Sequence, residues 1–289
     1  MVTFPSGHIK VYRNVDLKCQ ALLPCYNQKS KVYQVECTCS EIIAAYEDGS
    51  ICSWDLKNGE LKGRIWVRGS GGPDDLPFRI KYKDRKLVVA TKEGTIQTWQ
   101  YISPNFTRLG CWQVTGTLVS RIEFDLCYVL LQDIYSFSVN VYFPTGQFVR
   151  MIQSNSAAMA YQNGKLITGD EDQVLNIWDV GTGVFLCKLE GHNESIDSVE
   201  IIQKNIVMIG SYSSGVFTVW DLAKILESSS GGDDGDEENS AFAAAATPSK
   251  RLVVAKNDFQ HPVFRVGRNS IVGRIKGGLR IIDFPCRKS

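Results

Sequence analysis

Three histidines are the residues of this chain best suited to acid–base catalysis, and none has the neighbours that such chemistry needs. They are His8 in a strand-like run, His192 in a loop after a glycine, and His261 before a proline. The nearest candidate for a nucleophile on a strained turn, Ser211–Gly215, lacks the glycine two residues before the serine. No combination of nucleophile, oriented base and oxyanion donor is found. The sequence therefore predicts no catalytic residue and no enzyme activity.

Metal and nucleotide sites are not predicted either. Cys37 and Cys39 form a C-x-C pair, but no second pair of cysteines or histidines lies nearby in the sequence to complete a zinc site. The Gly/Pro/Asp-rich segment Arg68–Leu76 is followed neither by Gly-Lys-Ser/Thr nor by a helical pattern, so it does not have the form of a phosphate-binding loop. We expect that loop to be exposed, and we expect no metal and no cofactor.

The stretch Gly164–His192 shows which elements must position the remaining polar residues. It divides into three short apolar-rich strands, Lys165–Gly169, Val174–Trp178 and Val184–Leu189, separated by turn-forming residues. Short strands bounded by such turns are typical of an antiparallel meander. One such unit cannot bury its own faces, so a repeat is expected.

The unit recurs along the chain at a nearly constant period. Each copy ends in a bulky residue, and the intervals between these closing residues are 42, 45, 43, 36, 42 and 62 residues by subtraction, against about 40–45 for a four-stranded propeller blade. The copy that ends at Tyr142 is degenerate because its second turn has no glycine. The closing residues are Tyr12, Trp54, Trp99, Tyr142, Trp178, Trp220 and Ile282.

Three of the closing tryptophans are followed by aspartate, at Trp54, Trp178 and Trp220, and a Gly-His pair ends at His192. In these features the chain resembles the WD-repeat family. The resemblance implies an all-β, seven-bladed β-propeller that forms a single domain over residues 1–289. Because both ends of the chain read as the middle of a blade, we expect an incomplete first or last blade and an N-terminally shortened product.

The resemblance also implies hydrogen-bonded networks that fix the blades from within. It places His192, Ser211 and Trp220 in one such network, with Ser213 or Ser214 at its aspartate position. A buried indole N–H and a buried imidazole both need partners, which is the physical reason for these networks. The matching residues of the other blades are Asp172 and Trp178, Asp48 and Trp54, and Thr91 and Trp99.

The interval of 62 residues after Trp220 is longer than one blade. Residues 221–227 are compatible with a helix, and Ser228–Ser240 is rich in acidic residues, glycine and serine and has no large apolar residue. We therefore expect residues 223–250 to form a disordered acidic insertion between two blades.

Composition limits the cellular setting. The chain has 44% hydrophobic and 22% charged residues and a formal charge of +1, so it lacks the charge excess of a broad nucleic-acid or membrane-surface binder. No signal peptide and no apolar run of membrane-spanning length is visible. Nine cysteines scattered through strand-like runs indicate a reducing compartment. These features predict a cytoplasmic or nuclear protein.

With no catalytic set, the predicted role is a non-enzymatic scaffold for protein–protein interaction, which recognises substrates or partners within a multi-subunit complex. F-box proteins with C-terminal WD repeats, the substrate adaptors of ubiquitin ligases, are one model, although no F-box is visible here. The alternative is an RNA- or chromatin-associated scaffold.

The loops that lead into the first strand of each blade are expected to carry the partner-binding residues. Two guanidinium groups at corresponding places, Arg79 and Arg121, could hold a phosphate or a carboxylate, and the alternative is that they are ordinary solvated charges. The full predicted set is Arg79, Arg121, Lys31, Asp75 and Glu194.

Overall fold

The computed structural model of the chain describes residues 2–3, 9–12, 19–23, 30–38, 40–156, 158–169, 172–189, 192–203, 205–211, 216–229, 243–244, 250–253, 265–266, 270–275 and 278–283. In this part of the chain the fold is all-β except for one helix, α1 (Leu222–Ser229), which confirms the all-β part of the predicted fold. The chain divides into two compact units, Met1–Arg150 and Met151–Ser289. The single domain over residues 1–289 stays a prediction.

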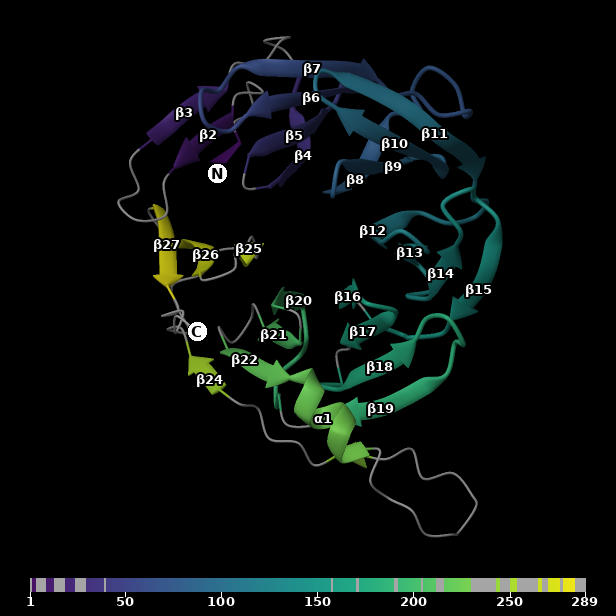
Figure 1. Cartoon of the computed structure of the whole chain (residues 1–289), viewed down its shortest axis with the longest axis vertical. Helices are drawn as coiled ribbons and strands as arrows, with labels where there is room; N and C mark the ends of the chain where they lie inside the picture. Colours follow the sequence, from purple (N-terminus) through teal and green to yellow (C-terminus); the bar gives the residue numbers. More distant parts are fainter. Residues whose placement is uncertain are drawn as a thin grey trace. The chain divides into compact units, whose positions relative to one another are not determined.

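The first unit is a succession of separate sheets, each built from strands that follow one another in the chain (Figure 1). The first sheet has three strands, β1 (Val2–Thr3), β2 (Ile9–Tyr12) and β3 (Cys19–Leu23). The second has β4 (Val32–Cys37), β5 (Glu41–Tyr46), β6 (Ser50–Asp55) and β7 (Leu61–Trp66). The third has β8 (Pro77–Lys83), β9 (Lys86–Thr91), β10 (Thr95–Ile102) and β11 (Asn105–Gln113). The fourth has β12 (Val119–Phe124), β13 (Val129–Asp133), β14 (Val139–Tyr142) and β15 (Phe148–Ile152), the last of which ends in the second unit.

The second unit repeats this plan with one addition. Its first sheet has β16 (Ala158–Gln162), β17 (Lys165–Gly169), β18 (Leu175–Asp179) and β19 (Phe185–Leu189), and β23 (Ala243–Ala244) pairs parallel to β19 as a fifth strand. The next sheet has β20 (Ser198–Gln203), β21 (Ile206–Ser211), β22 (Val216–Asp221) and β24 (Lys250–Val253). The last has β25 (Arg265–Val266), β26 (Ser270–Ile275) and β27 (Gly278–Asp283).

The repeat that was predicted from the closing residues matches these sheets. Each closing residue lies in a strand of a different sheet, from Tyr12 in β2 to Ile282 in β27. In the sheets that begin with β4, β8, β12, β16 and β20, the closing residue lies in the third strand along the chain. The blade-like antiparallel sheet is thus the repeating unit, whereas a closed propeller of seven blades stays a prediction.

The second strand of a sheet shows why these sheets stack face to face. In β5 the buried pattern is continuous, and alternate residues belong to different hydrophobic clusters: Ile42, Ala44 and Tyr46 pack toward the β1–β3 sheet, while Ile43 and Ala45 pack toward the β8–β11 sheet. Successive side chains of a strand point to opposite faces of its sheet. A strand that is apolar at every position is therefore buried on both faces.

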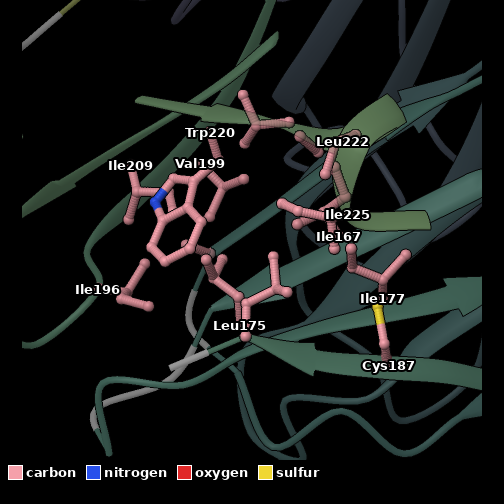
Figure 2. Close-up of a cluster of buried hydrophobic side chains, with 14 residues drawn as sticks. Ile167, Leu175, Ile177, Cys187, Ile196, Val199, Ile209, Trp220, Leu222 and Ile225 are labelled. Carbon is pink, nitrogen blue, oxygen red and sulfur yellow. The ribbon is translucent and has the colours of Figure 1, made fainter. Parts of the chain in front are cut away.

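In the second unit, the cluster between the β16–β19 and β20–β22 sheets contains Trp220, which is 1% exposed (Figure 2). Figure 2 shows the indole beside Ile196, Val199 and Ile209. Helix α1 adds Leu222 and Ile225, which are three residues apart and therefore share one face of the helix.

The segment 223–250, predicted as a disordered insertion, begins inside helix α1. Asp221 caps the helix, because its Oδ1 accepts a hydrogen bond of 3.1 Å from the backbone N–H of Ala223. Residues 223–229 are therefore helical, in agreement with the helical tendency of residues 221–227. Ala243–Ala244 forms β23, and residues 230–242 and 245–249 lie outside the described part of the chain.

Candidate functional site

A strip of polar side chains runs along the first strands of three neighbouring sheets in the first unit. In β8, Ile80 and Tyr82 are buried, whereas Arg79 and Lys81, which alternate with them, are half-buried. The same alternation appears in β4 and β12, as expected for strands with one face toward a core and one face toward solvent. We call this set the polar strip: Gln34, Glu36, Arg79, Lys81, Arg121 and Glu123.

Side chains of the polar strip connect the three strands directly. Gln34 Nε2 donates to the carbonyl of Ile80 (2.7 Å), and Gln34 Oε1 accepts from the Ile80 N–H (3.1 Å). Lys81 Nζ lies 2.6 Å from Glu123 Oε1. These contacts place β4, β8 and β12 side by side, as Figure 1 also shows.

The three first strands run in the same direction. Along β8, Arg79 contacts Ser120 of β12 and Lys81 contacts Glu123, which is further along β12, so β8 and β12 are parallel. Strand β4 is parallel to β8 as well, because Gln34 contacts Ile80, whereas Glu41, just beyond the end of β4, accepts a hydrogen bond from the Tyr82 hydroxyl (2.6 Å). The strands therefore begin at the same end, which we call the start edge. Because the second strand of each sheet runs antiparallel to the first, the hairpins β5–β6, β9–β10 and β13–β14 also lie at the start edge.

Arg79, near the start edge, is held in place by three contacts. Its Nε donates to the carbonyl of Ser120 (2.8 Å), its Nη1 donates to the carbonyl of Phe78 (3.0 Å), and its Cζ lies 4.1 Å from the centre of the Phe78 ring. Burial and the positive charge of Arg121 both lower the pKa of Arg79. The two guanidinium groups, predicted from corresponding strand positions, are thus close enough to repel each other. An anion bound between them would relieve that repulsion.

The other predicted partner-binding residues are placed differently. Lys31 is exposed one residue before β4, so it lies at the start edge, where Lys92 also sits with its Nζ 5.5 Å from the centre of the Tyr33 ring. Glu194 belongs to the second unit and is half-buried.

Asp75 was predicted to bind a partner, and the structure corrects this, because Asp75 is 1% exposed. Its Oδ2 accepts hydrogen bonds from the Gly71 N–H and from Thr95 Oγ1, each 3.1 Å long, and its Oδ1 accepts from the Glu93 N–H (2.9 Å). A Cβ atom added at Gly69 would lie 1.7 Å from Oδ2, so the loop can wrap the carboxylate only because it has a glycine there. The loop 68–76 does cradle an anion, and that anion is its own Asp75.

In the second unit, the predicted network of His192 and Trp220 meets at a residue that the sequence reasoning missed, Thr218. Trp220 Nε1 donates to Thr218 Oγ1 (2.9 Å), and His192 Nδ1 lies 2.8 Å from the same oxygen. His192, Thr218 and Ser211 are 1%, 0% and 0% exposed. Residues two apart in a strand share a face, so the hydroxyl two positions before the closing tryptophan was a usable signal.

The remaining predicted network residues differ in burial and in their contacts. Trp54 is 1% exposed and packs against Tyr46, with ring centres 6.1 Å apart. Trp178 Nε1 donates to Thr168 Oγ1 (3.2 Å). Asp172, in contrast, is exposed and does not belong to the buried set.

Two turn contacts complete the blade interiors of the first unit. Asp48 Oδ1 accepts from the Ser50 N–H (2.9 Å) within its tight turn, as an aspartate at that position should. Thr91 is 0% exposed, its Oγ1 accepts from the Thr95 N–H (3.0 Å), and it also bonds to Asp75. Trp99 is half-buried, and its Nε1 has no hydrogen-bond partner among the described residues.

Four residues of the sequence analysis, His8, His261, Ser213 and Ser214, lie outside the described residues. Within the residues that are described, no group of three or more His, Cys, Asp or Glu side chains is arranged to hold a metal ion. The described part of the chain also has no helix with the length and apolarity needed to cross a membrane.

Replacing Thr218 by valine, which has the same shape without the hydroxyl, should destabilise the protein by about 2 kcal/mol, since it leaves a buried indole N–H without its acceptor. Urea unfolding followed by circular dichroism measures the change. The control is Thr145→Val, because Thr145 is an exposed hydroxyl in the β14–β15 turn and should change the free energy of unfolding by less than about 0.5 kcal/mol. Equal effects of the two variants would contradict a shared role for the Thr218 hydroxyl.

Comparison with known proteins gives weak and partial similarity. No family model matches the chain. It is 20% identical over 208 residues to autophagy-related protein 16 of Arabidopsis thaliana, covering 66% of this chain and 40% of that protein. It is 28% and 30% identical over 88 residues to mitochondrial division protein 1 of Aspergillus clavatus and of Aspergillus oryzae, covering 29% of this chain and 13% of those proteins. The chain thus spans at most 40% of the length of these curated relatives.

Among solved structures, the chain is similar to the computationally designed Ika8 protein. The TM-score is 0.66 at 19% sequence identity, and the match covers 98% of this chain and 79% of that one. A likeness at this level of identity concerns the fold alone.

Proposed function

We propose that this protein is a non-enzymatic scaffold for protein–protein interaction, built as a seven-bladed propeller of the WD-repeat type. Three observations support the architecture: each closing residue lies in a different sheet, the second strands are buried on both faces, and the relatives found by comparison are weakly similar over up to 66% of the chain. A stack of sheets held by cores on both faces is stiff, and such scaffolds commonly bind through their loops and edges.

The observation that carries the binding role is the Arg79–Arg121 pair at the start edge. Arg79 is held by two backbone carbonyls and the Phe78 ring, so little side-chain entropy remains to be lost when a ligand binds. Its like-charged neighbour Arg121 makes an incoming carboxylate or phosphate favourable. The start edge is therefore the proposed partner-binding face.

The double variant Arg79→Glu/Arg121→Glu is expected to lose most of the partners that the wild-type chain recovers in quantitative affinity purification, because the reversed charges repel an anionic partner. The control is Lys57→Glu/Arg108→Glu, which changes the net charge equally at exposed positions in the β6–β7 turn and in β11. Circular dichroism of all variants checks that the fold is retained. Recovery of the same partners at equal yield by the wild type and the Arg79/Arg121 variant would exclude this face.

Within the scaffold role, the finer proposal is substrate or partner recognition in a multi-subunit complex, on the model of F-box/WD-repeat adaptors of ubiquitin ligases. Its support is architectural, and ubiquitin-ligase subunits among the recovered partners would test it. We also propose a cytoplasmic or nuclear location, which imaging of a fluorescent fusion tests.

The alternative role, an RNA- or chromatin-associated scaffold, rests on the same two arginines, because a phosphate fits between guanidinium groups as well as a carboxylate does. Binding to phosphates releases counterions and weakens steeply as salt is added. A salt titration with generic RNA separates the two roles, since negligible binding at all salt concentrations removes the alternative.

A further inference from the structure

The β13–β14 hairpin, residues 134–138, exposes three large apolar side chains at the start edge. Ile134, Tyr135 and Phe137 are 37%, 74% and 42% exposed. Large apolar side chains that are gathered in one short turn of a soluble protein commonly mark an interaction site. We call residues 134–138 the apolar hairpin.

The backbone of the apolar hairpin is held in one conformation by the side chain of Asp133. Asp133, which is 6% exposed, accepts hydrogen bonds from the Tyr135 N–H (3.3 Å), the Ser136 N–H (3.2 Å) and the Ser136 hydroxyl (2.7 Å). Burial alone would raise the pKa of Asp133, but hydrogen bonds from Ser136, Tyr135 and Leu118 outweigh it and lower the pKa. The exposed side chains are therefore attached to an ordered backbone, which reduces the conformational entropy that would be lost on binding.

Phe137 sits in a backbone conformation that an aromatic residue rarely adopts. Its φ is 53°, in the left-handed region. The other two hairpins at this edge have glycines in the left-handed region, Gly49 with φ 87° and Gly94 with φ 83°. A bulky residue in a conformation that favours glycine is a starting point for a functional hypothesis about its side chain.

The apolar hairpin lies next to the two arginines. The Ile134 backbone N–H donates to the carbonyl of Leu118 (2.9 Å). In the β12–β13 ladder, Arg121 lies opposite Gln132, which is two residues before the hairpin. At about 3.3 Å per residue along a strand and about 5 Å between strands, the Arg121 backbone is roughly 10 Å from the hairpin. A peptide of about four extended residues could therefore contact both.

We propose that the apolar hairpin and the Arg79–Arg121 pair together form one docking surface, which takes an acidic peptide segment of a partner protein that also carries a large apolar side chain. This inference rests on the proposed scaffold function and specifies the partner. Charge complementarity selects the acidic residue, which binds at the arginines. The exposed aromatic rings provide contact area for the apolar residue, and aromatic residues are the usual anchors of interfaces.

The test uses the full chain and a phage library of random dodecamer peptides, followed by fluorescence polarisation with the enriched peptide made synthetically. We expect enriched peptides to share an acidic residue and a large apolar residue a few positions apart. Tyr135→Ser should weaken binding about tenfold or more, as expected for a central aromatic anchor. The matched control is Leu126→Ser, since Leu126 is 76% exposed in the β12–β13 turn, at the other end of the same sheet.

A second variant separates binding from folding. Phe137→Asn places a residue that tolerates positive φ at this position, so the urea midpoint should stay equal or rise while binding weakens. A merely structural role for Phe137 would instead lower the midpoint, and that result would overturn the inference.

The remaining outcomes are distinguishable. Peptides that lose binding in Arg79→Glu/Arg121→Glu but bind Tyr135→Ser normally would overturn the apolar hairpin and leave the proposed function standing. If the enriched peptides have no acidic residues, or if they bind Arg79→Glu/Arg121→Glu as tightly as the wild type, the inference that the partner segment is acidic is overturned. If no peptide is enriched, or if binding is unchanged in every variant, both the inference and the proposed partner face fail.

Discussion

Replacing Trp220 by alanine is expected to destabilise the protein by about 3–5 kcal/mol, the range measured when large buried aromatic side chains are truncated. Trp220 is 1% exposed, and its indole fills the space between β20, β21 and the β16–β19 sheet (Figure 2). The variant also removes the donor that bonds to Thr218, so a cavity and a disrupted polar contact add together. The free energy of unfolding, from urea titration followed by circular dichroism, measures the loss.

Trp178→Ala is the matched control, because Trp178 occupies the equivalent third strand of the preceding sheet but is only half-buried. It should cost less, because it buries less apolar area than Trp220 does. An effect of Trp220→Ala no larger than that of Trp178→Ala would contradict the central position of Trp220 in its cluster.

Local patterns in the sequence were sufficient to predict the strands and their repeat. Strand Glu41–Tyr46 could be predicted because its apolar run is short and ends at the turn Glu47–Gly49, and these are properties of neighbouring residues. The hairpin after Asp133 was considered degenerate because it has no glycine. The structure shows a turn that Asp133 and Ser136 build with their side chains, so a different turn chemistry replaces the glycine.

The contacts of the candidate site were less predictable, because they depend on which segments meet in three dimensions. The Arg79–Arg121 pair could be found, since equivalent positions in repeated strands become neighbours when sheets stack. The burial of Asp75 could not, because it depends on the loop folding back far enough to place the Glu93 and Gly71 N–H groups around one carboxylate. The loop is exposed at Ser70, Gly71 and Asp74, as its composition predicted, but composition could not show that Asp75 turns inward.

Asp75→Asn is expected to lower the free energy of unfolding by about 2–4 kcal/mol at pH 7, since buried hydrogen bonds to a charged group are lost and donors are left unmatched. The carboxylate accepts from two backbone N–H groups, one on each oxygen, and neither donor can reverse its direction. The amide has a single acceptor oxygen, so its NH₂ group must face one of the two N–H donors. Asp74→Asn is the control, because Asp74 is exposed in the same loop and should change stability by less than about 0.5 kcal/mol.

The pH dependence of this loss identifies its cause. Burial alone would raise the pKa of Asp75, but the hydrogen bonds from Thr91, Glu93, Gly71 and Thr95 outweigh it, so the folded pKa lies below the ordinary value. A carboxyl group with a lowered pKa adds stability above its unfolded pKa, about 3.9, and that stability is lost as the pH falls through the folded pKa. The gap between wild type and Asp75→Asn should therefore be widest near neutral pH and narrow below about pH 4. A gap that stays constant from pH 7 to pH 3 would mean that the shape of the side chain, rather than its charge, holds the loop.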